Sequence, residues 1–251
     1  MTIDATTTVR ELALNIPGAT RVFEQLGIDY CCGGNKPLEQ ACGEVNLQIQ
    51  QVLDALESAA AAQGQPRDRP PVLEGEGWQN EALADLVAHI ENRHHKYVKA
   101  EIARLQPLFQ KVCGAHAIKH PELLELQSAF HALTQELTMH MMKEEMVFFP
   151  YIVRMEEAVI AGEPILPAPF VTVNNPVAIM IHEHDSAGNL LRAMRQVSNG
   201  YQLPEDACMS YGALYSALAE FERDLHQHVH LENNILFPRA IQMEREKQWQ
   251  P

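Results

Sequence analysis

One arrangement of histidine and acidic side chains occurs twice in this 251-residue sequence. The segment HMMKEEMVFFP begins at His140, and HVHLENNILFP begins at His228, 88 residues later. Each histidine is followed four residues on by a glutamate, Glu144 or Glu232, and then by Phe-Pro at the same place. Four residues advance an α-helix by about 6 Å and about 40° past one turn, so each pair shares one helix face. Such a pair can bind a metal ion inside a helix bundle.

An acid lies one turn before each of these histidines, Glu136 before the first and Asp224 before the second. A carboxylate there can accept the hydrogen bond of the ring N–H that faces away from a metal, which fixes the tautomer and strengthens the imidazole as a ligand. We therefore predict that both acids support ligands. Glu183, which lies between two further histidines, is either an ordinary surface acid or a residue that supports a ligand or transfers protons.

Two more histidine segments complete the site if the repeat extends upstream. His95 precedes the first copy by 45 residues and His184 precedes the second by 44, so this choice keeps the repeat within one residue. His94 and His182 precede the two copies by 46 residues each, so spacing alone leaves both choices open. Either choice gives a site of four histidines and two glutamates.

Six nitrogen and oxygen ligands are too many for one tetrahedral zinc ion, but they suit two metal ions bridged by two carboxylates. Imidazole with carboxylate favours iron over soft copper or hard magnesium, while ligand type leaves iron and manganese open. A single His-x3-Glu on a helix is more often a solvated surface pair. Two copies at equivalent repeat positions make metal binding the better interpretation.

Helices must position these residues, because apolar residues recur three and four apart through residues 78–247. The predicted helices are Glu81–Val112, Pro121–Ala161, Pro176–Asn199 and Pro204–Arg245. We expect kinks or breaks at Pro107, Pro150 and Pro238. Four long helices with short loops predict an up-down four-helix bundle, with the methionines at 139–146 packed in its core.

A small helical module is predicted in residues 1–62, which makes the whole chain all-α. Thr8 and Glu11 have the spacing of a capping box at the start of its first helix. A second helical stretch starts at Pro17 and ends at Gly27, and Pro37 opens a third. A fourth follows in residues 47–56. Residues 63–77, QGQPRDRPPVLEGEG, are predicted to be a linker, because Pro and Gly interrupt any periodic pattern.

Cys31 and Cys32 lie in a Tyr-Cys-Cys-Gly-Gly turn before the helix opened by Pro37. A nearby helix N-terminus lowers the pKa of a thiol and raises its reactivity. We interpret the pair either as redox or metal-handling thiols or as part of a structural turn. A disulfide between them would be strained, since adjacent Cα atoms are only about 3.8 Å apart.

The charge balance excludes some partners. Lys and Arg total 19 against 33 Asp and Glu, and the net charge of −14 argues against nucleic acid or an anionic membrane surface. No apolar run approaches the roughly 18 residues that span a bilayer, and the N-terminal residues lack the pattern of a targeting signal. With an odd number of cysteines, we expect a cytoplasmic protein.

Several longer motifs carry a family resemblance. They are LALNIP from Leu12, DYCCGG from Asp29, HMMKEE from His140, EHD from Glu183 and LENNILFP from Leu231. In this order, over nearly the whole chain, they resemble the cytoplasmic di-iron iron-sulfur cluster repair proteins, or RIC family, whose C-terminal half is hemerythrin-like.

The resemblance implies two non-haem iron ions with oxo and carboxylate bridges. Carried over by position, the ligands are His95, His140, Glu144, His184, His228 and Glu232, with both glutamates bridging. This selects His95 and His184 from the pairs that spacing left open. Family members have an aromatic residue where this chain has His94, which keeps His94 as an alternative ligand. Glu136 and Glu183 match acids that line the path to the irons in the family.

The resemblance also implies a function: restoring iron-sulfur clusters damaged by nitric oxide or peroxide, by supplying iron from a labile bridged site to the damaged proteins. The alternative is a protein that binds or reduces nitric oxide, or binds another small diatomic ligand. Oxygen-carrying hemerythrins use five histidines, so four leave more open coordination and a weaker hold on iron. A metal-free helical interaction module is the remaining alternative, and the number of chains stays open, with a homodimer as one arrangement.

Overall fold

The structure is a computed structural model that describes residues 4–62 and 77–248. Within these ranges the regular structure is helical, and one isolated bridge joins Thr8 and Pro37 in place of a strand. The described residues form two compact units. The first comprises residues up to Ala82 together with His226–Arg239, and the second comprises Leu83–Leu225 and the residues from Ala240 onward. The all-α prediction is confirmed, while the predicted linker 63–77 lies outside the described residues except for Gly77.

The N-terminal part of the first unit contains four helices: α1 (Val9–Asn15), α2 (Ala19–Leu26), α3 (Leu38–Glu44) and α4 (Ile49–Ala62). The Thr8 side chain accepts from the Glu11 backbone N–H and the Glu11 carboxylate accepts from the Thr8 backbone, so the predicted capping box is present. Gly27 ends α2 at φ 70°, a left-handed conformation that glycine adopts without strain.

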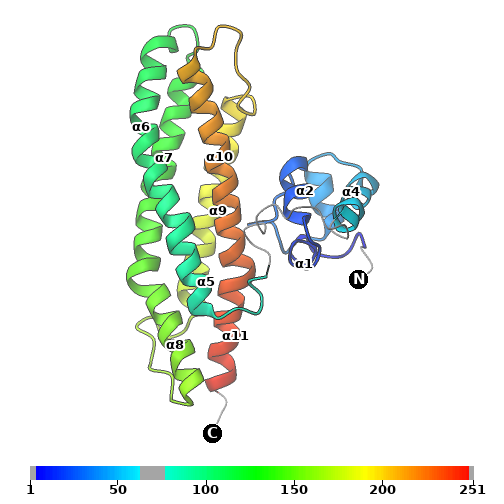
Figure 1. Ribbon diagram of the computed structural model, residues 1–251, viewed down its shortest axis with the longest axis vertical. Coiled ribbons are helices and arrows are strands. Elements are labelled where there is room, and N and C mark those ends of the chain that lie inside the picture. The colour runs from blue at the N-terminus through cyan, green and yellow to red at the C-terminus, as the bar shows by residue number, and fades with distance from the viewer. Residues whose placement is uncertain (1–3, 63–76, 249–251) are drawn as a thin grey trace. The chain divides into compact units, whose positions relative to one another are not determined.

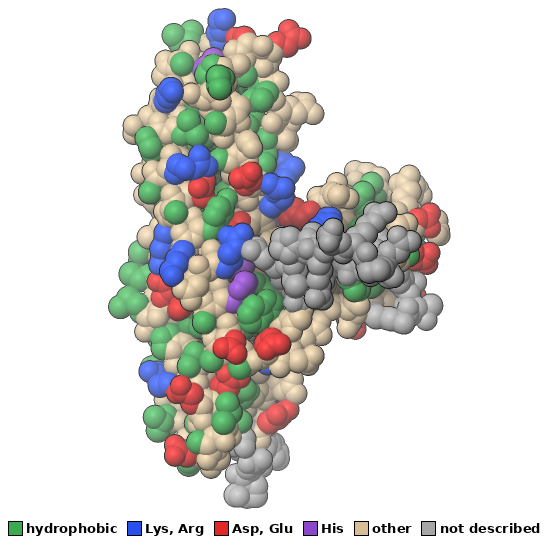
Figure 2. Space-filling model, viewed as in Figure 1, with side chains coloured by type: hydrophobic (Ala, Val, Ile, Leu, Met, Phe, Trp, Pro, Cys, Tyr) green, Lys and Arg blue, Asp and Glu red, His purple; other side chains and the backbone are tan. Residues whose placement is uncertain are grey.

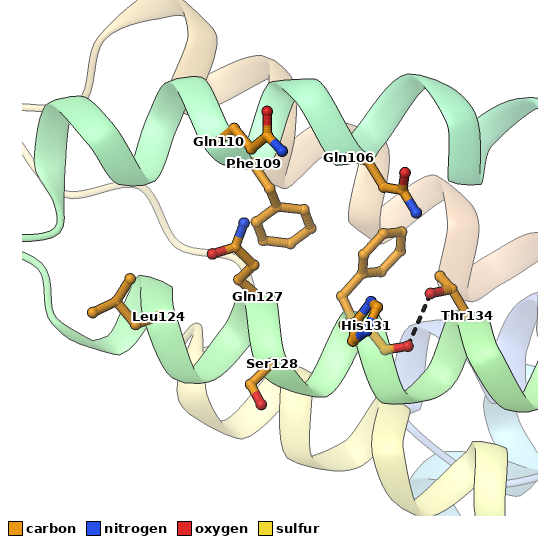
Figure 3. Close-up of a pocket in the computed structure, with 9 residues that line it drawn as sticks. Gln106, Phe109, Gln110, Leu124, Gln127, Ser128, His131 and Thr134 are labelled. Atoms are coloured by element: carbon orange, nitrogen blue, oxygen red, sulfur yellow. Dashed lines mark hydrogen bonds between the residues drawn. The ribbon is translucent and has the colours of Figure 1, made fainter.

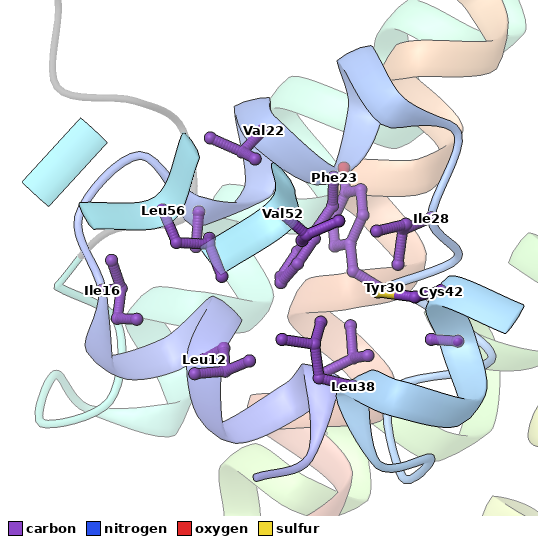
Figure 4. Close-up of a cluster of buried hydrophobic side chains, with 13 residues drawn as sticks. Leu12, Ile16, Val22, Phe23, Ile28, Tyr30, Leu38, Cys42, Val52 and Leu56 are labelled. Carbon is purple, nitrogen blue, oxygen red and sulfur yellow. The ribbon is translucent and has the colours of Figure 1, made fainter. Parts of the chain in front are cut away.

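These helices enclose one hydrophobic cluster, drawn in Figure 4. Each helix contributes apolar side chains to it, and the segment between α2 and α3 adds an aromatic ring. Its members include Leu12, Phe23, Tyr30, Leu38, Val52 and Leu56, all 2% exposed or less. The module therefore has a core of its own.

Long helices make up most of the described residues from Leu83 onward (Figure 1). The connection 117–121 is short, as expected, whereas 162–173 and 198–208 are longer than the short loops that the sequence predicted. In chain order they are α5 (Leu83–His89), η1 (Ile90–His95) and α6 (Lys96–His116); α7 (Glu122–Lys143), η2 (Glu144–Phe148) and α8 (Phe149–Ala161); α9 (Asn174–Val197); and α10 (Met209–Leu231), η3 (Glu232–Leu236) and α11 (Phe237–Gln248). Each group runs as one continuous helix, which confirms the predicted four-helix bundle. No helix in the described residues is both long and apolar enough to cross a bilayer.

A turn of π-helix interrupts three of these long helices: η1, η2 and η3. Such turns are rare in proteins, and those that do occur are often found at functional sites. Two of them precede the prolines at which we expected kinks, because Pro150 and Pro238 are each the second residue of the α-helix that follows. Before each of these two prolines the helix continues, with the i→i+5 hydrogen bonds of a π-helix in place of the i→i+4 bonds of an α-helix. At Pro107 the helix α6 continues.

The repeat extends beyond the segments seen in the sequence. Glu156 accepts hydrogen bonds from the backbone N–H groups of Leu83 and Ala84 at 2.7 and 2.8 Å, at the start of α5. Glu244, 88 residues after Glu156, accepts from the backbone N–H of Val173 at 3.1 Å, at the start of α9. Both carboxylates are buried. Each satisfies donors that a helix N-terminus leaves without intrahelical partners, so each ties one long helix to the start of another.

The surface carries both charge signs. Figure 2 shows acidic side chains spread along the visible face of the long helices, with basic and hydrophobic side chains between them. The prediction that the methionines at 139–146 pack in the core is wrong for most of them. Met141 is buried, but Met139, Met142 and Met146 are exposed, because they lie on the outer face of α7 and η2.

Glu156→Ala should lower the free energy of unfolding by about 1–3 kcal/mol, because two backbone N–H groups at the start of α5 lose their acceptor. Thermal unfolding followed by circular dichroism measures this. The matched control is Glu157→Ala, since Glu157 is exposed on the same helix. Equal destabilisation by the two substitutions would contradict the assigned role of Glu156.

Candidate metal centre

The structure brings the six predicted ligands together in two buried groups. In each group the four ligand atoms, one per residue, lie within 4.8 Å of one another. The groups are His95, Glu144, His228 and Glu232, and His140, Glu144, His184 and Glu232. All six residues are at most 3% exposed. Since Glu144 and Glu232 belong to both groups, the arrangement is that of a binuclear metal site with two shared carboxylates.

The two oxygens of Glu144 face different histidines. Oε2 lies 3.4 Å from Nε2 of His95, and Oε1 lies 3.3 Å from Nε2 of His140. Nε2 of His184 lies 3.0 Å from Nε2 of His140, a separation suited to two ligands of one ion. Nε2 of His228 lies 2.9 Å from Glu232 Oε1. Three of the imidazoles, those of His95, His140 and His228, thus direct Nε2 toward a shared carboxylate, and the fourth directs Nε2 toward His140.

In His95 and His140 the other ring nitrogen, Nδ1, meets a carboxylate. His95 Nδ1 lies 2.7 Å from Glu145 Oε1, which also accepts from Lys99 Nζ. His140 Nδ1 lies 2.8 Å from Glu183 Oε2, and Lys143 donates to the other oxygen of Glu183. A carboxylate accepts the proton at Nδ1, which leaves the Nε2 lone pair directed at a metal.

Both outer carboxylates are held in the ionised form. Burial raises the pKa of Glu145, but hydrogen bonds from Lys99 and His95 outweigh it, so the net pKa is lowered. The same balance lowers the pKa of Glu183: burial raises it, and the hydrogen bonds from Lys143 and His140 lower it by more. Each histidine therefore faces a charged acceptor at neutral pH.

Comparison with known proteins agrees with this geometry. Residues 86–240 match the family described as the hemerythrin HHE cation binding domain, and residues 5–60 match ScdA_N, a domain of unknown function. The chain is 37% identical to the iron-sulfur cluster repair protein YtfE of Pectobacterium atrosepticum, over 93% of this chain and 96% of the relative. It is 36% identical to YtfE of Yersinia pseudotuberculosis, with the same coverage. The chain belongs to the hemerythrin-like iron-sulfur cluster repair family. The resemblance inferred from the sequence is thereby confirmed.

The supporting acids in this family member differ in part from those predicted. Glu183 lies against His140, in the position we had expected for Glu136, and Glu136 is exposed on α7. Asp224 is buried, but its carboxylate contacts His94 Nδ1 at 3.2 Å and Arg93 at 3.4 Å. The physical reason is that Nδ1 of His140 turns toward α9, so an acid on that helix reaches it. Sequence spacing missed Glu145, because its role depends on a histidine from a different helix.

The alternative ligands lie outside both groups. His94 is buried as deeply as His95, but its ring packs edge-on against His89, with centroids 5.6 Å apart. His182 is exposed on α9, whereas His184 is 2% exposed. The structure therefore favours the same choice as the family resemblance.

A hollow of about 470 Å³ lies between α6 and α7, and Figure 3 shows its walls. Phe109 and Phe130 line it, with their ring centroids 5.1 Å apart, and three glutamine side chains line it as well. None of the six predicted ligands lines it. This hollow is therefore not the metal centre of the repair protein.

Cys31 in the N-terminal module has an environment opposite to the one expected. A hydrogen bond with Cys32, burial, and the nearby Cys32 and Asp29 raise the pKa of the Cys31 thiol well above its usual value. Helix α3, whose N-terminus was expected to act on the thiol, begins only at Leu38, seven residues after Cys31. The expectation of a lowered pKa is wrong for Cys31.

His140→Ala should reduce the bound metal from two ions per chain to one or none, because His140 supplies one of two imidazoles in its group. Metal analysis of the purified chain measures this, with circular dichroism to confirm that the helices are retained. His182→Ala is the matched control, since His182 is exposed. Retention of two metal ions in the His140 variant would show that the ligand set is wrong.

Glu183→Gln should weaken metal binding about 10–100-fold, because the neutral amide no longer holds the proton at Nδ1 of His140 as strongly. Competition with a chelator measures the affinity. Glu136→Gln, on the exposed side of α7, should leave it unchanged. If the two variants behave alike, Glu183 does not support the ligand.

Proposed function

We propose that this protein repairs iron-sulfur clusters damaged by nitrosative or oxidative stress, using two non-haem iron ions bridged by an oxo group and by Glu144 and Glu232. His95, His140, His184 and His228 are the terminal ligands in this proposal. The observation that carries it is the pair of buried four-residue groups that share two carboxylates. The YtfE relatives, whose names describe iron-sulfur cluster repair, support the same function.

The residues present fit a pair of iron ions. Each group offers two imidazole nitrogens and oxygens from two shared carboxylates, the donor types that suit iron better than copper or magnesium. The two shared glutamates are fully buried, and carboxylates removed from water need a cation or hydrogen-bond donors around them. Metal ions between the two groups would satisfy that requirement.

Four protein donors per ion leave coordination positions open, because six-coordinate geometry is common for iron with nitrogen and oxygen ligands. The bound iron supplies a labile metal ion for rebuilding a damaged cluster, and in this proposal it is the cargo. The chain's part is to present the Nε2 atoms of its histidines. Glu145 and Glu183 hold the protons on the outer nitrogens of His95 and His140.

In this proposal, iron ions pass between solvent and the buried site beside Glu145 and Glu183. The side chains of Glu145 and Glu183 are 28% and 30% exposed, although the histidines they contact are buried. Lys99 and Lys143 donate hydrogen bonds to these carboxylates. These two acid–lysine pairs are where ions pass between solvent and the buried ligands.

The clients in this proposal are proteins with damaged iron-sulfur clusters, and the protein works in the cytoplasm. We also propose the domain division expected from the sequence: residues 1–62, a linker at 63–77, and a hemerythrin-like domain at 78–247. The matched family regions, 5–60 and 86–240, support it.

The second candidate function is binding or reduction of nitric oxide. The same open positions support it, since a small diatomic molecule needs only one vacant site on each ion. Anaerobic titration of the reduced, iron-loaded protein with nitric oxide distinguishes the two functions. An iron-nitrosyl spectrum with formation of nitrous oxide, and no reactivation of a damaged client, would favour this second function.

The repair function predicts that iron-loaded protein reactivates an iron-sulfur dehydratase damaged by nitric oxide. Activity should return faster than with the same concentration of an iron salt, because the protein delivers its cargo directly. The His140→Ala variant should give no more reactivation than the salt. If the intact protein also does no better than the salt, the repair proposal fails.

A further inference from the structure

A second group of ligand atoms lies in the N-terminal module, away from the histidines. Asp29, Cys31 and Cys32 each offer one atom, and the three atoms lie within 4.8 Å of one another. The two sulfurs are 3.8 Å apart. Asp29 Oδ1 lies 3.3 Å from the sulfur of Cys31. None of these residues belongs to the binuclear site.

The loop that carries this group is tightly built. Asp29 Oδ1 also accepts from the backbone N–H groups of Cys32 at 2.9 Å and Gly33 at 3.0 Å, so the chain folds around the carboxylate. A Cβ at Gly33 would lie 2.7 Å from the carbonyl oxygen of Asp29, closer than real side chains approach. The residue after Cys32 must therefore be glycine for the sulfurs to stay beside the carboxylate.

Two side chains of η3 hold the same loop. Asn234 Nδ2 donates to the carbonyl oxygen of Tyr30 at 3.0 Å, and Asn233 Nδ2 donates to that of Cys31 at 3.2 Å. A Cβ at Gly34 would approach Asn234 Oδ1 to 3.1 Å. The backbone on either side of Cys31 is thus fixed, and the positions of the two sulfurs are set before any ligand binds.

The distances match those of a tetrahedral metal site. Two sulfurs that bind one ion at about 2.3 Å, at a tetrahedral angle, lie about 3.8 Å apart. A carboxylate oxygen bound at about 2.1 Å lies about 3.6 Å from each sulfur. The observed separations of 3.8 and 3.3 Å agree with these values to within a few tenths of an ångström.

The chemistry of the group selects the class of ion. Two thiols and a carboxylate become negative when they lose their protons, and so close together they repel one another unless a cation lies between them. Thiolate sulfur selects thiophilic ions such as zinc over magnesium or calcium, which prefer oxygen. Cys32 and Asp29 are partly exposed, so an ion from solvent has access.

We propose that Asp29, Cys31 and Cys32 bind one thiophilic divalent cation of the zinc class, with a fourth coordination position left to water or an external ligand. On binding, the ion replaces the protons of both thiols, which leave to solvent, and no electron is transferred. The site is separate from the di-iron centre and does not depend on the repair function.

Cobalt titration of the full-length, iron-loaded protein tests this proposal, because thiolate-bound Co²⁺ gives charge-transfer absorption that histidine and carboxylate sites lack. We expect the absorption to saturate at one Co²⁺ per chain and to disappear when Zn²⁺ is added. Cys32→Ser should abolish it, and Asp29→Asn should weaken cobalt binding about tenfold or more. Cys208→Ser, at an exposed thiol, is the matched control and should change nothing.

Three results would overturn the proposal: no thiolate charge-transfer absorption, unchanged absorption in Cys32→Ser, or loss of absorption in Cys208→Ser. Since Cys32 is partly exposed, its substitution to serine spares the hydrophobic cluster, and circular dichroism verifies folding. Reactivation of a damaged dehydratase is measured on the same samples. Failure of cobalt binding and failure of repair are therefore separate outcomes.

Discussion

The burial of Glu144 and Glu232 constrains the whole metal centre. Both carboxylates are fully removed from solvent, where an isolated negative charge costs several kcal/mol. Hydrogen-bond donors alone do not offset that cost, because Nε2 atoms of His95 and His140 lie beside Glu144, and outer acids draw the protons of these two rings to Nδ1. Imidazole lone pairs and buried carboxylates in one place require cations between them. The binuclear site is the arrangement that meets this requirement.

The two copies of the sequence repeat position their shared glutamates with the same local structures. In both halves a π turn begins at the shared glutamate, and a proline is the second residue of the α-helix that follows. Twelve residues beyond each glutamate, Glu156 or Glu244 holds the start of another long helix. A π turn shifts the angular position of the residues that follow it by adding one residue to the turn. The repeat therefore preserves the helix distortion and the helix anchors together with the ligands.

Part of this could be predicted from the sequence, because it depends on local spacing. His140 with Glu144 and the capping box of Thr8 with Glu11 involve residues within one or two turns of a helix, whose geometry is fixed. Contacts between different helices could not be predicted in this way. Glu145 orients His95 across helices, and Glu183 orients His140 from α9, so neither pair has a characteristic spacing. The π turns also could not be predicted, because each one changes the spacing of apolar residues by only one residue. Only the prolines indicated that the helices are distorted.

In the proposed metal centre, two shared carboxylates hold two metal ions in one site. X-ray absorption at the iron edge of the iron-loaded protein tests it most directly, because the scattering reports both the ligand atoms and any second metal nearby. We expect nitrogen and oxygen neighbours only, together with a second iron within about 4 Å of the first. A single iron per chain, or an iron spectrum without metal–metal scattering, would contradict it.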